Sequence, residues 1–337
     1  MILVVSFHIC TALIEALVFY PIMLTYQELK ERQSWTLYQK IDHAVGVIEQ
    51  YLSRLDGKAY ISFSGGKDST VLLDIVRRFV KPDCPAVFCN TGNEFPEIVR
   101  FVKSVDNVTI IRPKYSPKQI IEKYGFPLIS KEQSQYIRQA KYTQSDILRN
   151  IRRNGKVGRN GKVLTTGKIA NKWLYLIDQS FDVTEKCCHY LKKEPFHRFG
   201  KETGLYPIIG TMADESRLRL QKWLKVGCNS FDSNQIGSYP LSIFTEADIW
   251  GYIRYFNIPY CPIYDIPEVK RTGCMFCGFG CHMKGDKRFY MLQSHKPKIY
   301  DSFMRMENNG ITYRQALQIC KVDFPDMKNK QLAFDFQ

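Results

Sequence analysis

Seven residues between a predicted strand and a predicted helix constrain this chain more than any other part. They are Ser64, Gly65, Gly66, Lys67, Asp68, Ser69 and Thr70, between residues 59–63 and 71–80. Adjacent glycines let backbone N–H groups turn inward, and the following helix presents its positive end to an anion. The lysine adds a cation, and the hydroxyl groups add donors. The segment predicts a phosphate-binding loop.

Further strands follow the loop at intervals typical of an α/β protein. Residues 86–90 and 108–112 complete a βαβαβ half, and residues 205–210 and 239–244 supply two more predicted strands. Thr91 and Gly92 follow the second strand, where ligands bind in open α/β sheets. We expect a Rossmann-like, mostly parallel five-stranded sheet, with a basic insertion and a C-terminal cysteine-rich helical lobe.

A second segment predicted to contact nucleotide follows the strand at 205–210. It contains Gly210, Glu215, Ser216 and Arg219 at the start of a predicted helix that runs to Lys225. An ordinary charged, solvated first helical turn is the alternative interpretation.

Cysteines are abundant and two groups of them are closely spaced. The chain has 11 cysteines, including the adjacent pair Cys187 and Cys188 and a C-x₂-C-x₃-C run at Cys274, Cys277 and Cys281. Disulfides rarely persist in a reducing cytosol, so metal or thiol chemistry is favoured. The spacing alone fits zinc or iron–sulfur, and the scattered cysteines fit core positions.

Three of these segments resemble one protein family. The loop resembles the pyrophosphate loop of the adenine nucleotide alpha-hydrolase group, which includes the phosphoadenosine phosphosulfate (PAPS) reductase family. Residues 91–97 resemble that family's second motif, with Asn90 in place of its aspartate. The Gly210–Arg219 segment resembles a third, with Met212 where many members have arginine, which weakens the case for a sulfated or 3′-phosphorylated nucleotide. The resemblance covers about residues 36–305, and residues 271–282 look most like a subgroup of phages and mobile elements.

The resemblance implies the cofactors and the site residues. Cys187, Cys188, Cys274 and Cys277 are the implied ligands of a [4Fe–4S] cluster, which we favour over zinc. Assimilatory reductases usually lack a lysine in the loop and use a C-terminal Glu-Cys-Gly-x-His motif, whereas this chain has Lys67 and lacks that motif. ATP with Mg²⁺ is therefore the expected nucleotide. Lys67 and Asp68 are the catalytic candidates, with Cys281 as sulfur carrier or nucleophile.

The expected reaction is ATP cleavage to AMP and pyrophosphate for sulfur transfer to a nucleic acid or a small acceptor. A thiol-dependent reductase of adenylyl sulfate or phosphoadenylyl sulfate is the first alternative. A regulator that binds nucleotide or nucleic acid without catalysis is the second. Expected partners include a sulfur-donor protein such as a cysteine desulfurase, and a second copy of the chain.

A net charge of +15 favours polyanionic partners. From Arg138 to Lys172 there are ten lysines or arginines and one acid, Asp146. Two Asn-Gly-Lys-Val repeats in this segment predict turns of a hairpin. We expect either a nucleic-acid contact, with Arg152, Arg153, Lys156, Arg159 and Lys162 as first phosphate ligands, or a solvated insertion.

The chain divides into three predicted regions. They are an apolar N-terminal extension and helix at 1–35, a nucleotide-binding domain at 36–257 with an insertion at 131–180, and a cysteine-rich lobe at 258–337. We expect a soluble cytoplasmic enzyme. Residues 2–24 are apolar enough to raise the alternatives of a membrane anchor or a partner helix, although His8, Glu15 and Pro21 interrupt them.

Overall fold

The computed structural model describes residues 24–158, 161–232 and 236–325. Its centre is a six-stranded sheet in the order β3-β2-β1-β7-β9-β8. The strands are β1 (Ala59–Ser62), β2 (Ala86–Cys89), β3 (Val108–Ile111), β7 (Tyr206–Ile209), β8 (Asn229–Ser230) and β9 (Gly237–Ser238). Neighbouring strands are parallel except β8 and β9, which are antiparallel. The expected mostly parallel α/β sheet is confirmed, with one more strand than predicted.

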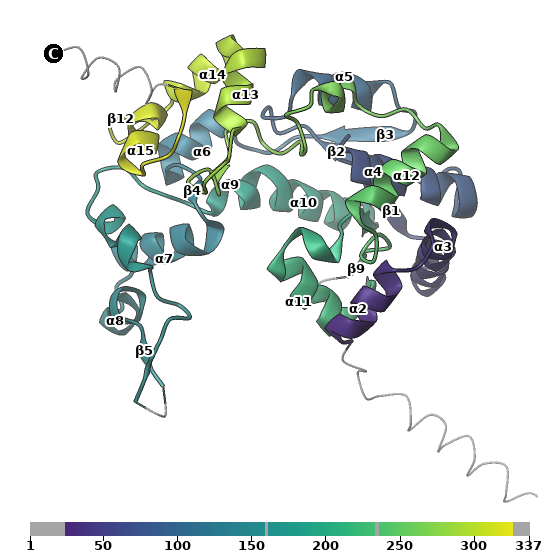
Figure 1. Ribbon diagram of the computed structural model, residues 1–337, viewed down its shortest axis with the longest axis horizontal. Coiled ribbons are helices and arrows are strands. Elements are labelled where there is room, and N and C mark those ends of the chain that lie inside the picture. The colour runs from purple at the N-terminus through teal and green to yellow at the C-terminus, as the bar shows by residue number, and fades with distance from the viewer. Residues whose placement is uncertain (1–23, 159–160, 233–235, 326–337) are drawn as a thin grey trace, which may run out of the picture.

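Helices cover both faces of this sheet (Figure 1). Strand β2 is buried along its whole length, as parallel strands under two helical layers must be. The helices of the body that contains this sheet are α2 (Tyr26–Gln33), α3 (Leu37–Arg54), α4 (Lys67–Ile75), α5 (Pro96–Lys103), α6 (Pro117–Tyr124), α9 (Lys186–Cys188), α10 (Glu194–Thr203), α11 (Arg217–Val226) and α12 (Glu246–Phe256). A π-helical turn, Val76–Val80, continues α4, and another, His189–Lys193, joins α9 to α10.

The predicted strand at 239–244 is wrong. These residues form turns, in which Ser242 N–H donates to the Tyr239 carbonyl and Phe244 N–H donates to the Leu241 carbonyl. Pro240 has no N–H for a strand ladder. Leu241, Ile243 and Phe244 are nonetheless fully buried. The apolar pattern therefore indicated that these side chains are buried, but it did not indicate an extended backbone. The strand of this region is the short β9, just upstream.

Residues 131–180 project from the body as an arm (Figure 1). The arm consists of α7 (Lys131–Tyr142), α8 (Asp146–Asn154) and an antiparallel hairpin of β5 (Lys156–Val157) and β6 (Val163–Leu164), followed by the 3₁₀ helix Asn171–Ile177. The predicted hairpin is therefore confirmed for the residues that are described.

The cysteine-rich region folds against the body beside the arm. Its strand β10 (Gly278–Phe279) pairs in parallel with β4 (Leu128–Ile129). Its other elements are α13 (Arg288–His295), α14 (Pro297–Met304), the hairpin of β11 (Glu307–Asn308) and β12 (Ile311–Thr312), and α15 (Tyr313–Ile319). The predicted apolar extension at 2–23 and the tail after 325 lie outside the described residues. Within the described ranges, no helix combines the length and apolar character that crossing a membrane requires.

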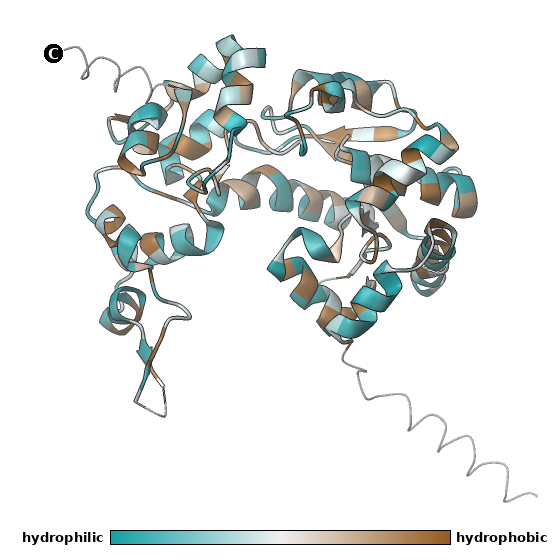
Figure 2. Ribbon diagram, viewed as in Figure 1, coloured by the Kyte–Doolittle hydropathy of each residue, from teal (hydrophilic) through white to brown (hydrophobic). Residues whose placement is uncertain are grey.

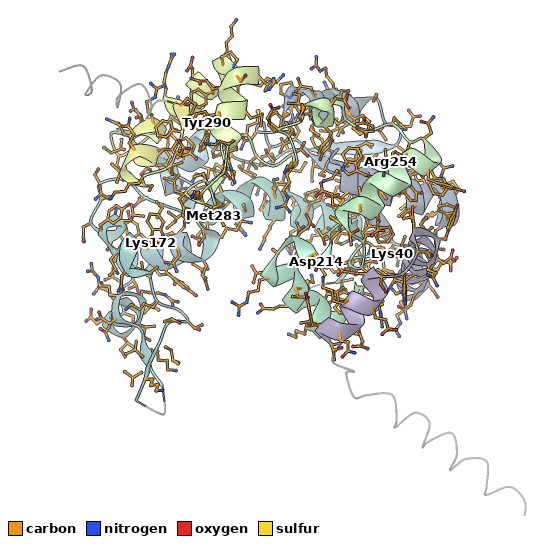
Figure 3. All side chains as sticks on the ribbon, viewed as in Figure 1. Lys40, Lys172, Asp214, Arg254, Met283 and Tyr290 are labelled. Carbon is orange, nitrogen blue, oxygen red and sulfur yellow. The ribbon has the colours of Figure 1, made fainter. Side chains whose placement is uncertain are left out.

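A buried ion pair ties α3 to the start of α12. Lys40 is 2% exposed, and its Nζ donates to Asp248 Oδ2 at 2.7 Å. The same carboxylate accepts from Thr245 N and Thr245 Oγ1, forming a capping box at the start of this helix. Lys40, a residue of α3, is labelled in Figure 3.

Removing one partner of this pair should destabilise the fold more than removing both. Asp248→Ala leaves a buried ammonium group unpaired, so we expect a loss of about 3 kcal/mol in the free energy of unfolding. Lys40→Met together with Asp248→Ala should recover much of that loss. Guanidinium unfolding followed by circular dichroism measures both variants, and equal losses would show that the pair contributes no charge-specific stability.

Candidate functional site

The predicted phosphate loop has the geometry that its glycines allow. Gly65 has a φ of 70°, and a Cβ there would lie 2.7 Å from Val102 Cγ2, so a larger residue would be strained and crowded. Gly66 precedes α4 and carries no side-chain cap, which leaves the helix N-terminus open to other acceptors.

Hydroxyl groups in the loop mainly hold the loop itself. Ser69 Oγ donates to the Gly66 carbonyl at 2.9 Å and accepts from Ser64 N at 3.1 Å. Thr70 Oγ1 also donates to the Gly66 carbonyl, at 3.1 Å. These bonds fix the turn, so Thr70 supports the loop from within.

A cavity of about 320 Å³ opens at the carboxyl ends of β1, β2 and β7. This volume is in the range of small-molecule sites. The predicted residues that line it are Ser64, Asp68, Ser69, Gly210, Glu215 and Arg219. Aromatic and aliphatic side chains form the rest of its wall, including Phe88, Phe95, Ile98 and Phe196. The cavity thus combines a polar phosphate-sized end with an apolar surface.

The other predicted binding residues lie next to this cavity and not in its lining. Thr91 N and Oγ1 both donate to the carboxylate of Glu94, which does line the cavity. Gly92 takes a φ of 77°, as this tight turn requires. Ser216 caps α11 by accepting from Arg219 N at 3.3 Å.

Lys67 and Asp68 form a buried charged group at the start of α4. Lys67 is 5% exposed, and its Nζ lies 3.7 Å from Asp68 Oδ1 and 3.5 Å from Glu246 Oε1. Burial raises the pKa of Asp68, although Lys67 counteracts part of that shift. Among the described residues, Asp68 Oδ1 has no hydrogen-bond partner. An unsatisfied buried carboxylate oxygen at a cavity wall is available to a ligand.

Two arginines, Arg219 and Arg271, contact Glu215, which also lines the cavity. Arg219, in the first turn of α11, pairs with this carboxylate from the preceding 3₁₀ turn, and Arg271 Nη2 lies 2.9 Å from Glu215 Oε1. Burial and the neighbouring Arg271 lower the pKa of Arg219. Glu215 therefore holds two cations near the cavity, of which Arg219 lines it.

The segment before the C-x₂-C run covers the loop and was not predicted to do so. Lys67 N–H donates to the Tyr264 hydroxyl at 3.2 Å, and this hydroxyl lies 2.8 Å from Thr272 Oγ1. A Cβ on Gly66 would lie 3.0 Å from Thr272 Oγ1. Residues 264–273 therefore act as a strap whose hydroxyl groups occupy the N-terminus of α4.

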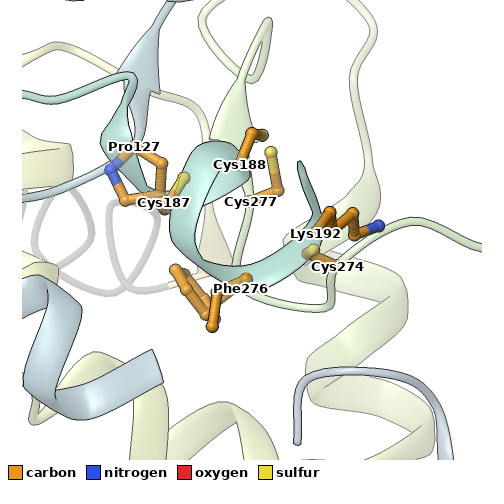
Figure 4. Close-up of a pocket in the computed structure, with 8 residues that line it drawn as sticks. Pro127, Cys187, Cys188, Lys192, Cys274, Phe276 and Cys277 are labelled. Atoms are coloured by element: carbon orange, nitrogen blue, oxygen red, sulfur yellow. The ribbon is translucent and has the colours of Figure 1, made fainter. Parts of the chain in front are cut away.

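Four predicted metal ligands line one pocket. Cys187 and Cys188, in α9, face Cys274 and Cys277 across a pocket completed by Pro127, Leu191, Phe276 and Lys192 (Figure 4). The space between these side chains is about 10 Å³, room for about one water. Two sequence segments 86 residues apart thus meet at this pocket, from Cys188 to Cys274.

Lysines compensate thiolate charge at this pocket. Hydrogen bonding from Cys187 lowers the pKa of Cys188, with Lys131 and Lys192 acting in the same direction. Burial raises the pKa of Cys274 to about 11, although Lys192 opposes that shift. The electrostatic interaction with Cys274 is in turn the largest influence that raises the pKa of Lys192.

Lys192 lines both the thiol pocket and the nucleotide-sized cavity. Its charge interacts with Cys274 and Cys188 on one side and with Glu94 on the other. Sequence patterns did not single out this residue for a role between two sites. Its position four residues after Cys188, within a helix, is the one signal that could have placed it beside the thiols.

The geometry distinguishes two kinds of metal site. In the described part of the chain, no three histidine, cysteine or acidic side chains converge closely enough to hold a single metal ion. A structural zinc site would need four ligands on one ion. A [4Fe–4S] cluster places one thiolate on each iron, so its ligands stand further apart.

Cys281 lies apart from both cavities. It is 2% exposed, its thiol lies 2.7 Å from the Gly278 carbonyl, and burial raises its pKa to about 12. A thiol in that state is a poor nucleophile at neutral pH. The structure therefore does not bring Cys281 to the loop or to the four-thiol pocket.

Comparison with known proteins identifies the family. Residues 58–154 and 149–279 match the phosphoadenosine phosphosulfate reductase domain. The chain belongs to this family of nucleotide-binding α/β proteins.

Individual relatives are distant. An uncharacterized protein of Methanocaldococcus jannaschii is 25% identical over 240 residues, covering 69% of this chain and 45% of the relative. An adenosine 5'-phosphosulfate reductase of Halalkalibacterium halodurans is 22% identical, and the match covers 69% of this chain and 80% of that relative. A sulfate adenylyltransferase subunit 2 of Agrobacterium fabrum is 25% identical, and the match covers 69% of this chain and 66% of that relative. The chain spans less than half the length of the archaeal relative.

Freeing the N-terminus of α4 should strengthen anion binding. Tyr264→Phe removes the acceptor that holds Lys67 N–H, and a phosphate oxygen can take this donor without displacing a hydroxyl. We expect inorganic pyrophosphate to bind about three- to tenfold more tightly, since one hydrogen bond contributes about 1 kcal/mol. Isothermal calorimetry measures this change. Tyr260→Phe is the control, because the Tyr260 hydroxyl bonds Asp265 instead. Weaker binding in Tyr264→Phe would mean that this hydroxyl contacts the anion directly.

Proposed function

We propose that this protein binds ATP with Mg²⁺ and cleaves it to AMP and pyrophosphate, to activate an acceptor for iron–sulfur-assisted sulfur transfer. The observation that carries the proposal is the shared wall between two sites. Lys192 lines the cavity at the phosphate loop and also the pocket of Cys187, Cys188, Cys274 and Cys277. An activated acceptor in the cavity would therefore lie next to the thiols.

The phosphate loop supports ATP as the nucleotide. Lys67 and the N-terminus of α4 supply positive charge for the pyrophosphate group. The apolar side of the cavity, with Phe88 and Phe196, suits a purine ring. A relative named as a sulfate adenylyltransferase subunit is consistent with adenylyl chemistry in this family.

In the proposed reaction, an acceptor oxygen attacks the α-phosphorus of ATP. The bond from that phosphorus to the pyrophosphate oxygen breaks, and Lys67 stabilises the charge on the departing pyrophosphate. A sulfur nucleophile then attacks the acceptor and displaces AMP. Where the persulfide of a donor protein such as a cysteine desulfurase delivers this sulfur, a thiol must then cleave the resulting S–S bond, which leaves the thiolated acceptor and a disulfide. Lys192 holds positive charge between the two reacting groups.

Asp68 suits the magnesium ion. Mg²⁺ prefers oxygen ligands and retains several waters, and one or two carboxylates commonly hold it beside phosphates. The unpartnered Oδ1 of Asp68, on the cavity wall, is the donor that fits.

The four-thiol pocket suits a [4Fe–4S] cluster in its donor chemistry. It provides four cysteines, and Lys131 and Lys192 offset their negative charge. The narrow space between the thiols means that their side chains must rotate outward to hold the group. When bound, the cluster would supply an iron at which sulfur is held for transfer.

Loss of the loop lysine should lower the rate of ATP cleavage while the protein stays folded. Lys67→Ala should weaken ATP binding and lower pyrophosphate release at least tenfold, because one of few cations at the phosphates is lost. A coupled pyrophosphate assay with reconstituted protein, ATP, Mg²⁺, sulfide and a nucleic-acid acceptor measures release. Lys58→Ala is the control, since this side chain is 62% exposed and precedes β1, whose opposite end leads into the loop.

Two results would contradict the proposal. Unchanged ATP affinity in Lys67→Ala would remove the loop from the site. Sulfite release from adenylyl sulfate or phosphoadenylyl sulfate with thioredoxin would establish the reductase alternative, which the reductase relative favours.

Neutralising Asp68 should stabilise the protein while impairing turnover. Its raised pKa means that the folded state binds a proton more tightly than the unfolded state, so the carboxylate opposes folding above its unfolded pKa. Asp68→Asn should therefore raise the Tm at pH 7 by about 1–3 °C and lower magnesium-dependent pyrophosphate release. The Tm gain should vanish below about pH 4, where both states are protonated. Differential scanning calorimetry at both pH values tests this, and a lower Tm at pH 7 would refute it.

The cluster assignment predicts different outcomes for neighbouring cysteines. Cys274→Ser should remove most of the visible absorbance and bound iron of anaerobically purified protein. Cys281→Ser should retain both, because its thiol lies outside the four-thiol pocket. Iron and sulfide assays measure the outcome. Equal loss in the two variants, with none in Cys187→Ser, would place the cluster on the later cysteines alone.

A further inference from the structure

The arm at residues 131–180 carries a surface that neither cavity uses. It contains eleven lysines and arginines against three acids, a surplus of eight in a chain whose net charge is +15. More than half of the excess charge therefore lies on a segment of 50 residues. The arm projects from the body, with the hairpin at its far end (Figure 1).

The arm is an ordered structure. Arg152 joins its parts, because the guanidinium donates to Gln139 Oε1 at 2.8 Å and to the Gly167 carbonyl at 2.6 Å, and stacks 4.2 Å from the Tyr136 ring centroid. Gln133 binds the Lys168 carbonyl and Ala170 N–H. Arg152 therefore serves as a brace within the arm and not as a phosphate ligand. Arg159, also predicted as a contact, lies outside the described residues.

Apolar side chains are exposed on the same arm. Ile147 is 76% exposed, Val157 63% and Val163 55%, and α8 has no buried residue. Figure 2 shows hydrophobic and hydrophilic residues alternating on the hairpin. Apolar residues gathered on a projecting element, instead of scattered singly, indicate a surface that becomes covered.

The positive charge of the arm indicates which kind of partner covers its exposed apolar surface. Among the described residues, Lys156, Lys168 and Lys172 have no acidic side chain within ion-pairing distance, and Lys172 lies at the base of the arm (Figure 3). Two copies meeting through their arms would bring two surpluses of eight positive charges together, which disfavours self-association there. A polyanion satisfies the charge. A two-stranded ribbon with basic and aliphatic side chains also fits a nucleic-acid groove.

The arm begins beside the thiol pocket. Pro127 lines this pocket, and α7 starts four residues later at Lys131. Helix α7 has 12 residues and is therefore about 18 Å long, close to the width of a nucleic-acid duplex. A duplex held at the hairpin can therefore reach the thiols along α7.

We propose that the arm binds the sugar–phosphate backbone of a nucleic acid and presents it to the thiol pocket as the sulfur acceptor. This inference rests on the proposed sulfur transfer for its chemistry, while binding itself can be tested separately. Lys156, Lys168 and Lys172 are the phosphate contacts, and Val157 and Val163 lie against the groove.

The test is a charge-matched pair of triple variants. The arm variant is Lys156→Gln, Lys168→Gln and Lys172→Gln, and the control is Lys58→Gln, Lys103→Gln and Lys201→Gln, three lysines exposed elsewhere. Fluorescence anisotropy measures binding to a labelled 24-base-pair DNA duplex and to a labelled RNA hairpin between 50 and 200 mM salt. The arm variant should bind about 10- to 100-fold more weakly, and its slope of log K against log salt should fall by about 2–3. The control should stay within about threefold of wild type.

The outcomes separate the two proposals. An equal loss of nucleic-acid affinity in both variants would show that binding depends only on net charge, and would overturn the arm's role. Unchanged binding in the arm variant would overturn it as well, and would leave the exposed valines to a protein partner. Pyrophosphate release from ATP is measured with wild-type protein and saturating nucleic acid, because the proposed reaction needs an acceptor oxygen. No release under these conditions would refute the proposed function while leaving the binding result valid. A preference for DNA or RNA identifies the source of the acceptor.

Discussion

The close approach of the strap to the phosphate loop is the contact on which the candidate site depends. Gly66 lies so near Thr272 and Tyr264 that a side chain at this position would push the strap away. The strap continues directly into Cys274, the first residue of the C-x₂-C run. The hydroxyl that occupies the α4 N-terminus belongs to Tyr264, and the proposed cluster ligand Cys274 follows it by ten positions. The short strap between them therefore links the phosphate loop to the thiol pocket.

Lys192 adds an electrostatic connection to this mechanical one. Its charge balances Cys274 and Cys188 on one side and Glu94 on the other, and Glu94 orders the Thr91 turn. Any ligand that changes the charge in either cavity alters the field in the other. In a buried setting such interactions are only weakly screened by salt. The two sites are therefore expected to influence each other even without a change in backbone conformation.

Local sequence patterns predicted the parts of this structure that depend on local physics. The glycines of the loop, the strands 59–62, 86–89, 108–111 and 206–209, and the capping box of Thr245 follow from spacing and residue type. The strand at 239–244 failed because burial in a turn and burial in a strand give the same apolar pattern. The strap could not be placed, since it acts on a loop far away in sequence. The spacing of Lys192 from Cys188 predicted its place beside the thiols, whereas its contact with the cavity and Glu94 could not be predicted. The two groups of cysteines were brought together through resemblance, and spacing alone would not have paired them.

The pairing of β4 with β10 has a consequence for how the protein is made. This pairing helps to bring Cys274 and Cys277 to Cys187 and Cys188, which are synthesised 86 residues earlier. At about 5–20 residues per second, the first two thiols wait roughly 4–17 s for the others to be synthesised. During that interval they lack half of their pocket and are exposed to oxidants and stray metal ions. Loading of the proposed cluster would then follow long-range folding, and a slow translation step between the two segments would lengthen the period in which the first two thiols are exposed.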